Sequence, residues 1–189
     1  MQFEFRPRKA AQAADYLLRL GKGEMNYVKL IKLLYMADRK SLVETGKTIT
    51  GDRMVAMNNG PVLSSIYDAI KGRVVVWSRT WKEYVAPAQD FRVRVRKEEA
   101  APLTAYDELS RYDIRVLTEI HVEYGKYPTW QLVRVLHGQL PEWTYPRGSS
   151  RVIDPADILR ACGWSPAAIE RATQESQSDL LLEQLGTIV

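Results

Sequence analysis

Apolar residues recur at helical spacing along the first quarter of the chain. Between residues 9 and 20 they return every three or four positions, which predicts a helix that ends at Gly21. A clearer pattern over residues 26–44 predicts a second helix with one apolar side, closed by Gly46. We expect its other side to face water, because that side is basic. Its basic residues are Lys29, Lys32, Arg39 and Lys40.

A third helix is predicted to begin at Gly60 and Pro61. The fixed φ and missing N–H of proline are compatible with the first turn of a helix. Apolar residues at helical spacing follow, and Gly72 is the predicted end.

The hydrophobic period changes between residues 91 and 96, where apolar residues alternate with arginines. Strict alternation predicts a strand with one buried face and one cationic face. Residues 81–85 are the natural partner of this strand, joined to it through residues 86–90. The sequence therefore predicts a basic β-hairpin near residues 81–97.

The second half of the chain returns to helical periodicity. Thr104 is the predicted N-cap of a long helix to about Tyr124, and Thr129 the N-cap of a helix to about His137. Cap-then-proline pairs at residues 154–155 and 165–166 predict two more helices, and the last can extend through the leucines at 180–182. We therefore predict a mainly α fold, a single compact multi-helix domain with an inserted basic β-hairpin.

Composition narrows the class of protein. The chain has 189 residues, of which 46% are hydrophobic and 26% charged, as in a globular domain with a core. No apolar run approaches the roughly 20 residues of a bilayer span, and the N-terminal residues lack the apolar centre of a signal peptide. The single Cys162 forms no intrachain disulfide. We expect a cytoplasmic protein with no membrane partner.

Charge is distributed unevenly. The net charge of +4 permits nucleic-acid or acidic-protein partners without requiring either. Residues 71–97 contain eight Lys or Arg against two acids, whereas residues 173–189 contain three acids and no base. The arginines of the predicted hairpin could contact phosphates, contact an acidic protein, or form a solvated edge strand. The candidate partner-binding residues are Trp81, Arg92, Arg94, Arg96 and Lys97.

Catalytic motifs are incomplete in this sequence. Residues 45–48 resemble the end of a phosphate-binding loop, but Ser41 stands where the first glycine is needed and a helix precedes. Residues 121–123 match half of a zinc deaminase motif, but the Pro-Cys-x-x-Cys segment is missing. We predict no catalytic residues, no metal site and no cofactor, and expect a protein that is not an enzyme. We expect His137, near Trp143, to be a structural histidine. Contact with a partner protein and a catalytic role are the two alternatives for this residue.

Residues 28–67 carry a more specific pattern, which resembles the Panacea domain of SocA-like antitoxins and phage-associated GepA-like proteins. The motif falls on Lys32, Leu33, Leu34 and Tyr35, on Ala56, on Gly60, Pro61 and Val62, and on Tyr67. The family's later His and Pro-Trp segment falls on His137 and Trp143, although Glu142 separates the proline from the tryptophan. The resemblance spans about residues 10–172. It places a Panacea-like domain at 1–172 and leaves 173–189 as an acidic C-terminal helix or tail.

The resemblance implies a prokaryotic or phage antitoxin that neutralises a cognate protein toxin by direct stoichiometric binding. It leaves open an additional role as an adaptor that delivers the toxin to a protease. The motif residues are then expected to be structural, with Gly60 and Pro61 shaping a turn and with Tyr35 and Tyr67 packing two helices together. Two alternatives remain at this point. One is a DNA-binding regulator that uses the hairpin in a winged-helix-like manner, and the other is an enzyme whose site is assembled from distant residues. DNA is the less favoured partner.

Overall fold

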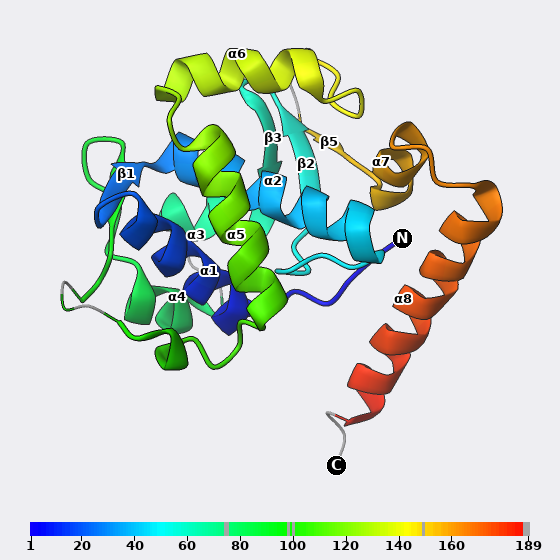
Figure 1. Ribbon diagram of the computed structural model, residues 1–189, viewed down its shortest axis with the longest axis horizontal. Helices are drawn as coiled ribbons and strands as arrows, with labels where there is room; N and C mark the ends of the chain where they lie inside the picture. The colour runs from blue at the N-terminus through cyan, green and yellow to red at the C-terminus, as the bar shows by residue number, and fades with distance from the viewer. Residues whose placement is uncertain (74–75, 98, 100, 149, 187–189) are drawn as a thin grey trace.

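The computed structural model describes residues 1–73, 76–97, 99, 101–148 and 150–186. In these ranges the chain is mainly α-helical with a few short strands (Figure 1). The α-helices are α1 (Pro7–Leu20), α2 (Tyr27–Thr45), α3 (Ser64–Ile70), α4 (Ser78–Tyr84), α5 (Arg111–Tyr124), α6 (Thr129–Gln139), α7 (Pro155–Ala161) and α8 (Pro166–Gly186), with a 3-10 helix η1 (Leu103–Ala105). The strands are β1 (Glu24–Asn26), β2 (Met54–Met57), β3 (Gly60–Leu63), β4 (Arg92–Arg94) and β5 (Arg151–Val152).

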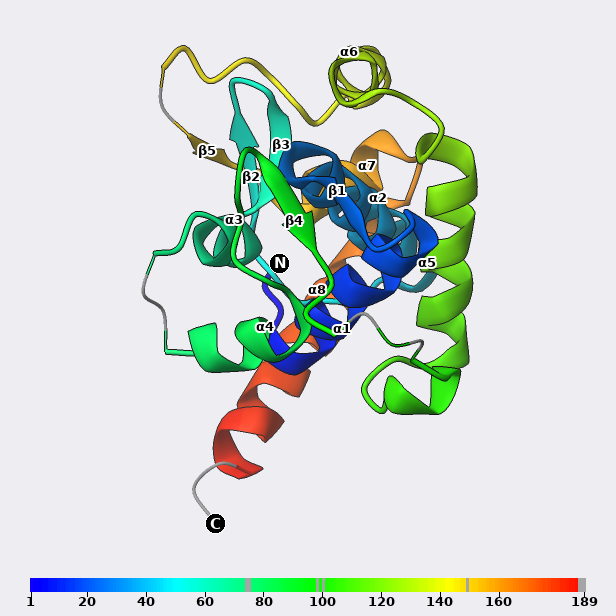
Figure 2. The same cartoon turned by 90° about the vertical axis from the view of Figure 1, so that its left-hand side faces the viewer.

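Helix α2 lies at the centre of the fold. It contacts α1, α5, α6, α7 and strand β3, so that neighbours surround it on most sides (Figures 1 and 2). The side chain of Asn26 accepts a hydrogen bond from the Val28 N–H at the start, and Gly46 in the left-handed region ends the helix, as predicted. The prediction that the basic side of this helix faces water is wrong for Lys32, whose side chain is buried at 1% exposure. A helix that is covered by neighbours on most sides buries polar positions as well as apolar ones.

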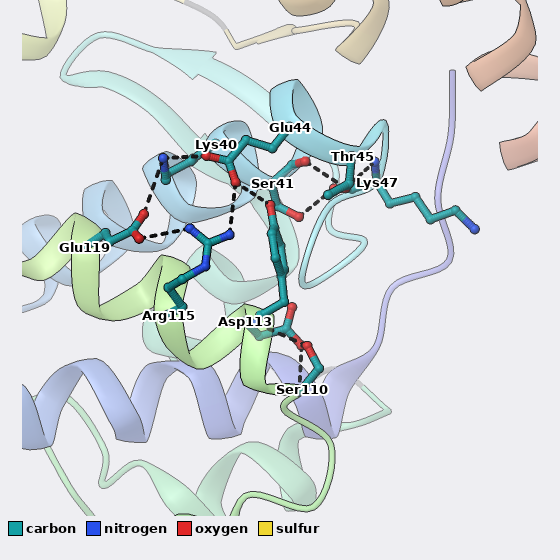
Figure 3. Close-up of polar contacts among 10 residues, drawn as sticks. Lys40, Ser41, Glu44, Thr45, Lys47, Ser110, Asp113, Arg115 and Glu119 are labelled. Atoms are coloured by element: carbon teal, nitrogen blue, oxygen red, sulfur yellow. Dashed lines mark hydrogen bonds and ion pairs between the residues drawn. The ribbon is translucent and has the colours of Figure 1, made fainter.

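Charged side chains join α2 to α5 at the surface (Figure 3). Lys40 pairs with Glu44 at 2.6 Å and with Glu119 at 3.4 Å. Arg115 pairs with Glu119 at 2.9 Å and with Glu44 at 3.5 Å. These side chains are all partly exposed, so each pair contributes little stability and the apolar contact beneath them holds the two helices together.

Strands β2 and β3 form an antiparallel hairpin, and β5 pairs with the other edge of β2. The predicted helix start at Gly60 and Pro61 is therefore wrong, because both residues belong to β3. Proline is also compatible with an edge strand, where its missing N–H costs no ladder hydrogen bond. The helix begins later, at Ser64, where the buried Asp52 carboxylate accepts hydrogen bonds from the Ser65 and Ile66 N–H groups.

The predicted hairpin over residues 81–97 is wrong in its first strand. Residues 81–84 belong to α4, and Trp81 is buried on the face of α4 that packs toward α1. Strand β4 pairs instead with β1, which follows α1, in the register Glu24 opposite Arg94. A single bridge, between Val85 and Val95, joins the two segments that were expected to pair. The alternation is confirmed for Val93 and Val95, which are buried between exposed arginines, and is wrong for Phe91, which precedes the strand with a positive φ and is 68% exposed.

Helices α5 and α7 begin at residues whose side chains cap them, whereas α6 follows Pro128, which provides no side-chain cap. Helix α5 begins after Ser110, whose hydroxyl and the Asp113 carboxylate form a capping box, and not after Thr104, which lies in η1. Thr129 is the first residue of α6 rather than its cap. The Asp154 cap of α7 is confirmed, and the helix after residue 165 extends through the leucines at 180–182.

Helix α8 leaves the body of the fold and points away from it (Figures 1 and 2). Residue 172, the predicted domain end, lies inside this continuous helix. Two ion pairs join its outer half to the N-terminal half of the chain, Arg6 with Glu183 at 3.1 Å and Lys47 with Asp179 at 2.6 Å. No helix in the described ranges has the length and apolar character to cross a membrane.

Candidate functional site

The structure brings the two halves of the sequence motif together around Gly60. Lys32 on α2, Gly60 on β3 and His137 on α6 meet where a Cβ atom on Gly60 would lie 3.1 Å from Lys32 Nζ and 3.2 Å from His137 Nε2. The φ of Gly60 is +92°, a left-handed value that glycine adopts at low cost after the tight turn at residues 58–59. The glycine therefore provides both the turn and the space that the lysine and the histidine occupy.

Lys32 is a buried ammonium group without an acidic partner. Its Nζ donates a hydrogen bond to the carbonyl oxygen of Pro61 at 2.5 Å. No carboxylate in the described ranges pairs with it, and burial lowers the pKa of Lys32 to about 7. Pro61 lies on the edge strand β3, where it has no N–H to offer and only its carbonyl to satisfy. Lys32 therefore satisfies the Pro61 carbonyl at the edge of the sheet, and its ammonium group titrates near neutral pH.

His137 is held flat against Trp143. Their rings are stacked with centroids 3.9 Å apart and an angle of 6° between the planes, and Trp143 Nε1 donates to the Met57 carbonyl at 3.0 Å. Nε2 of His137 is buried and has no hydrogen-bond partner among the residues that the structure describes. Burial and the nearby charge of Lys32 lower the pKa of His137, and a backbone hydrogen bond at Asn59 opposes this shift. A buried nitrogen without a partner beside a buried ammonium is an unusual polar pair.

Tyr35 of the motif contacts the residue that interrupts the Pro-Trp pair. Its hydroxyl donates to Glu142 Oε1 at 2.8 Å, and Arg39 donates to the same carboxylate from Nε at 2.7 Å and from Nη2 at 3.2 Å. The Glu142 side chain is 0% exposed. Burial and the adjacent carboxylate raise the pKa of Tyr35 well above its ordinary value. Glu142, which sequence reasoning treated as a departure from the family pattern, is therefore the buried anion that joins α2 to the segment after α6.

A groove of about 540 Å³ opens beside Lys32, and we call it the Lys32 groove. Its floor is one face of the β2–β3 hairpin, because the paired residues Val55 and Val62 point to the same side as the pair Met57 and Gly60. Helices α2 and α3 form its walls, and Tyr67 lines it from α3. Its charged lining residues are Lys32, Arg53, Asp68 and Arg73.

The remaining motif residues belong to the core. Leu33, Leu34 and Ala56 are fully buried, and Pro61 and Val62 are buried in β3. The motif therefore contributes both to the centre of the fold and to the groove, and Val62 belongs to both.

The sequence profile described as "Antitoxin SocA-like, Panacea domain" matches residues 30–144, which is more than half of the chain. The chain belongs to this SocA-like Panacea family. No curated protein and no solved structure matches it. The matched range contains the motif residues from Lys32 to Trp143 and most of the groove lining, whereas Tyr27, Val28, Gly148 and Ser150 line the groove from outside the match.

The basic surface proposed from the Panacea sequence is only partly present. Arg92 and Arg94 are exposed on β4, but both pair with Glu24 of β1, at 2.6 and 3.4 Å. Arg96 and Lys97 are exposed beyond the strand. Trp81 is not part of this surface, because it is 4% exposed and packs edge-on against Trp77. We define the basic strand as Arg92, Arg94, Arg96 and Lys97. Its first two arginines are paired with an acidic residue, Glu24, whereas Arg96 and Lys97 at its end are exposed basic side chains.

Two buried carboxylates of the domain were missed by the sequence analysis. Asp38 accepts hydrogen bonds from the Ile49 and Thr50 N–H groups, each at 2.9 Å, and its burial raises its pKa to about 7. Asp52 caps α3, as described above. The hydrogen bonds from backbone N–H groups to these two carboxylates hold the loop between α2 and β2. The one sequence signal for them is the cluster of small polar residues in this loop. No three His, Cys, Asp or Glu side chains in the described ranges are grouped as metal ligands would be.

Proposed function

We propose that this protein is an antitoxin that neutralises a cognate protein toxin by direct, stoichiometric binding in the cytoplasm. Membership of the SocA-like family supports an antitoxin role in general. The observation that carries the proposal is the Lys32 groove, to which the motif residues Lys32, Gly60, Val62 and Tyr67 contribute and which has an apolar floor, tyrosine side chains and a recessed cation. This mixture of apolar, aromatic and polar lining is typical of a surface that receives side chains of another protein.

We infer that neutralisation involves no catalysis by this chain. Lys32 and His137 are the two groups near the groove whose pKa values are lowered toward or below neutrality. They do not form the hydrogen-bonded nucleophile and base that covalent catalysis requires, because Lys32 donates to a backbone carbonyl and His137 Nε2 has no partner in the described ranges. Binding alone is the mechanism that these contacts support.

The test begins with the product of the neighbouring open reading frame. Its expression should arrest growth, and co-expression of this protein should restore growth. Titration of the purified toxin activity with this protein should then reach its endpoint at a fixed molar ratio. Complete inactivation at a small fraction of that ratio would show turnover and would contradict the proposal. An adaptor role would appear as a shorter toxin half-life that depends on a cellular protease.

The DNA-binding alternative loses its expected geometry. It required residues 81–97 to form a wing, but β4 pairs with β1, and residues 81–84 are helical. Two of its phosphate-contacting candidates, Arg92 and Arg94, share Glu24 as a counter-ion. We therefore assign the exposed end of the basic strand to an acidic protein surface rather than to a phosphate backbone.

A further inference from the structure

We propose that the Lys32 groove binds a carboxylate group carried by an acidic segment of the toxin, with the Lys32 ammonium as the anchoring cation. This inference rests on the proposed antitoxin function and specifies the chemistry of the partner at this site.

The first support is an unfilled capacity for hydrogen bonding. An ammonium group has three N–H donors, and the one partner of Lys32 in the described ranges is the Pro61 carbonyl. His137 Nε2, beside the same glycine, has no partner there. Leaving buried polar groups without partners costs stability, and an acceptor placed at this point would satisfy the free N–H groups of Lys32 directly and His137 Nε2 once the imidazole is protonated. A carboxylate has two oxygens that only accept, so one group could bond to the ammonium and to a protonated imidazole.

The second support is the charge of the groove. Its lining contains three basic side chains and one acidic side chain, and the acid, Asp68, pairs with Arg73 at 2.6 Å. Arg53 lines the groove with its Nε 3.4 Å from Ser64 Oγ and pairs with no carboxylate in the described ranges. Arg53 and the protonated form of Lys32 therefore leave the groove with positive charge that no carboxylate in the described ranges neutralises, and this charge attracts an anion.

The third support is the depth of the lysine, which separates a protein carboxylate from a nucleic-acid phosphate. Lys32 is 1% exposed, at the base of a groove whose floor includes Val55, Met57 and Val62. The phosphates of a nucleic acid are contacted by cations that project from a protein surface. A glutamate or aspartate side chain, or a chain terminus, is slender enough to enter, and its aliphatic part would lie on the apolar floor. Tyr27, which also lines the groove, stacks on Phe91 with ring centroids 6.1 Å apart, so one edge of the groove lies next to the residue that precedes the basic strand.

Proton uptake on binding is the expected signature. A bound carboxylate favours the charged form of Lys32, whose pKa lies at about 7 in the free protein, and of His137, whose pKa is lowered. The other titratable or charged groups around the groove are Arg53 before β2, Tyr67 and Asp68 of α3, Arg73 and Tyr27. Asp68 is paired with Arg73, and Lys32 loses its proton in this range, so affinity for a carboxylate should fall as the pH rises through neutrality.

The test uses three small probes on the isotopically labelled full-length protein. They are N-acetylglutamate methylamide, its glutamine counterpart and inorganic phosphate, each titrated at constant ionic strength while the NMR signals of the Lys32 ε-methylene and the His137 ring are followed. The glutamate probe should shift both signals saturably, and the glutamine probe should not. In Lys32→Met the shift of the His137 ring signal should disappear, whereas Lys29→Met should retain both shifts, because Lys29 lies on the same helix, donates to the Gly125 carbonyl and does not line the groove.

Three results would overturn the carboxylate assignment. These are an equal response to the glutamine probe, a response that survives in Lys32→Met, and saturation by phosphate at lower concentration than by the glutamate probe, which would assign the groove to a phosphate ligand. Lys32→Met keeps the volume and removes a buried charge, so a folded variant is expected.

Toxin binding separates this inference from the function on which it rests. Lys32→Met should weaken toxin binding by roughly tenfold or more, the effect of losing a charge-assisted contact, and Lys29→Met should not. If the wild-type protein neutralises the toxin and Lys32→Met binds it equally well, the antitoxin function stands and the groove assignment is overturned. If the wild-type protein binds the glutamate probe but neutralises no toxin, the antitoxin function fails, and with it the toxin as the source of the carboxylate.

Discussion

Tyr35 donates its hydroxyl hydrogen to Glu142, a residue 107 positions away in sequence, across an Oη–Oε1 distance of 2.8 Å. Arg39 binds the same carboxylate, so one buried anion joins a helix from the first quarter of the chain to a loop from its last quarter. The contact explains how the two separated parts of the Panacea motif are held in register beside the groove.

Removing the charge of Glu142 should destabilise the fold. Glu142→Gln keeps an oxygen for Tyr35 but leaves Arg39 without its counter-ion, and the expected loss in the free energy of unfolding is about 3 kcal/mol. Urea denaturation of the purified variant measures it. Glu44→Gln, which removes a partly exposed partner of Lys40, is the matched control and should cost less than about 1 kcal/mol. Equal effects of the two variants would contradict a buried role for Glu142.

Lys32 should make stability depend on pH above neutrality. Its pKa of about 7 in the fold lies below the 10.5 of an unburied lysine, so between these values the unfolded chain binds the extra proton. The free energy of unfolding should therefore rise with pH from about 7 toward 10, and this part should be absent in Lys32→Met. At pH 7 the variant should be more stable than the wild type by roughly 2–5 kcal/mol. Parallel stability curves for the two proteins would contradict this prediction.

Gly60 should not tolerate a side chain. Gly60→Val places a branched residue at a φ of +92° and a Cβ 3.1 Å from Lys32 Nζ, and should lower the free energy of unfolding by roughly 1–3 kcal/mol. The control is Gly138→Ala in α6, where an added Cβ meets no atom within 4 Å and a small gain in stability is expected. Thermal denaturation compares them. An unchanged midpoint for Gly60→Val would show that the turn accepts ordinary residues.

The basic strand and the groove should affect toxin binding through different rates. Exposed charges at the rim of an interface mainly guide association, so replacing Arg92, Arg94 and Arg96 by Gln should slow association and reduce its dependence on salt. Lys32→Met should instead speed dissociation, because the lysine is recessed. Surface plasmon resonance with the immobilised toxin separates the two rates.

The same triple variant tests DNA binding. If the arginines contact phosphates, the slope of log K against log salt for DNA should fall by about 0.9 for each lost contact. Full neutralisation by the folded triple variant, combined with such a change in slope, would contradict the assignment of the basic strand to the toxin.

Local chemistry along the sequence determined the helices whose ends carry their own signals. Asn26 and Gly46 define α2, and the aspartate-proline pair at residues 154–155 defines the start of α7, because caps and prolines act within one turn of the chain. The alternation around Val93 determined which side chains of β4 are buried. The family pattern identified the motif residues, including both members of the His137–Trp143 stack.

Only the tertiary structure decided what these elements pair with and what they cover. Pro61 is compatible with a helix start and with an edge strand, so the local sequence does not distinguish the two. In the same way, β4 could pair with any free strand edge, and the local sequence does not specify β1 as its partner. Helical spacing placed Lys32 opposite the apolar side of α2, but α2 is surrounded by other elements and the lysine is buried. The groove and its unpaired cation arise from contacts between α2, β3 and α6, and a charge is recognised as buried only when the segments that cover it, far away in sequence, are in place.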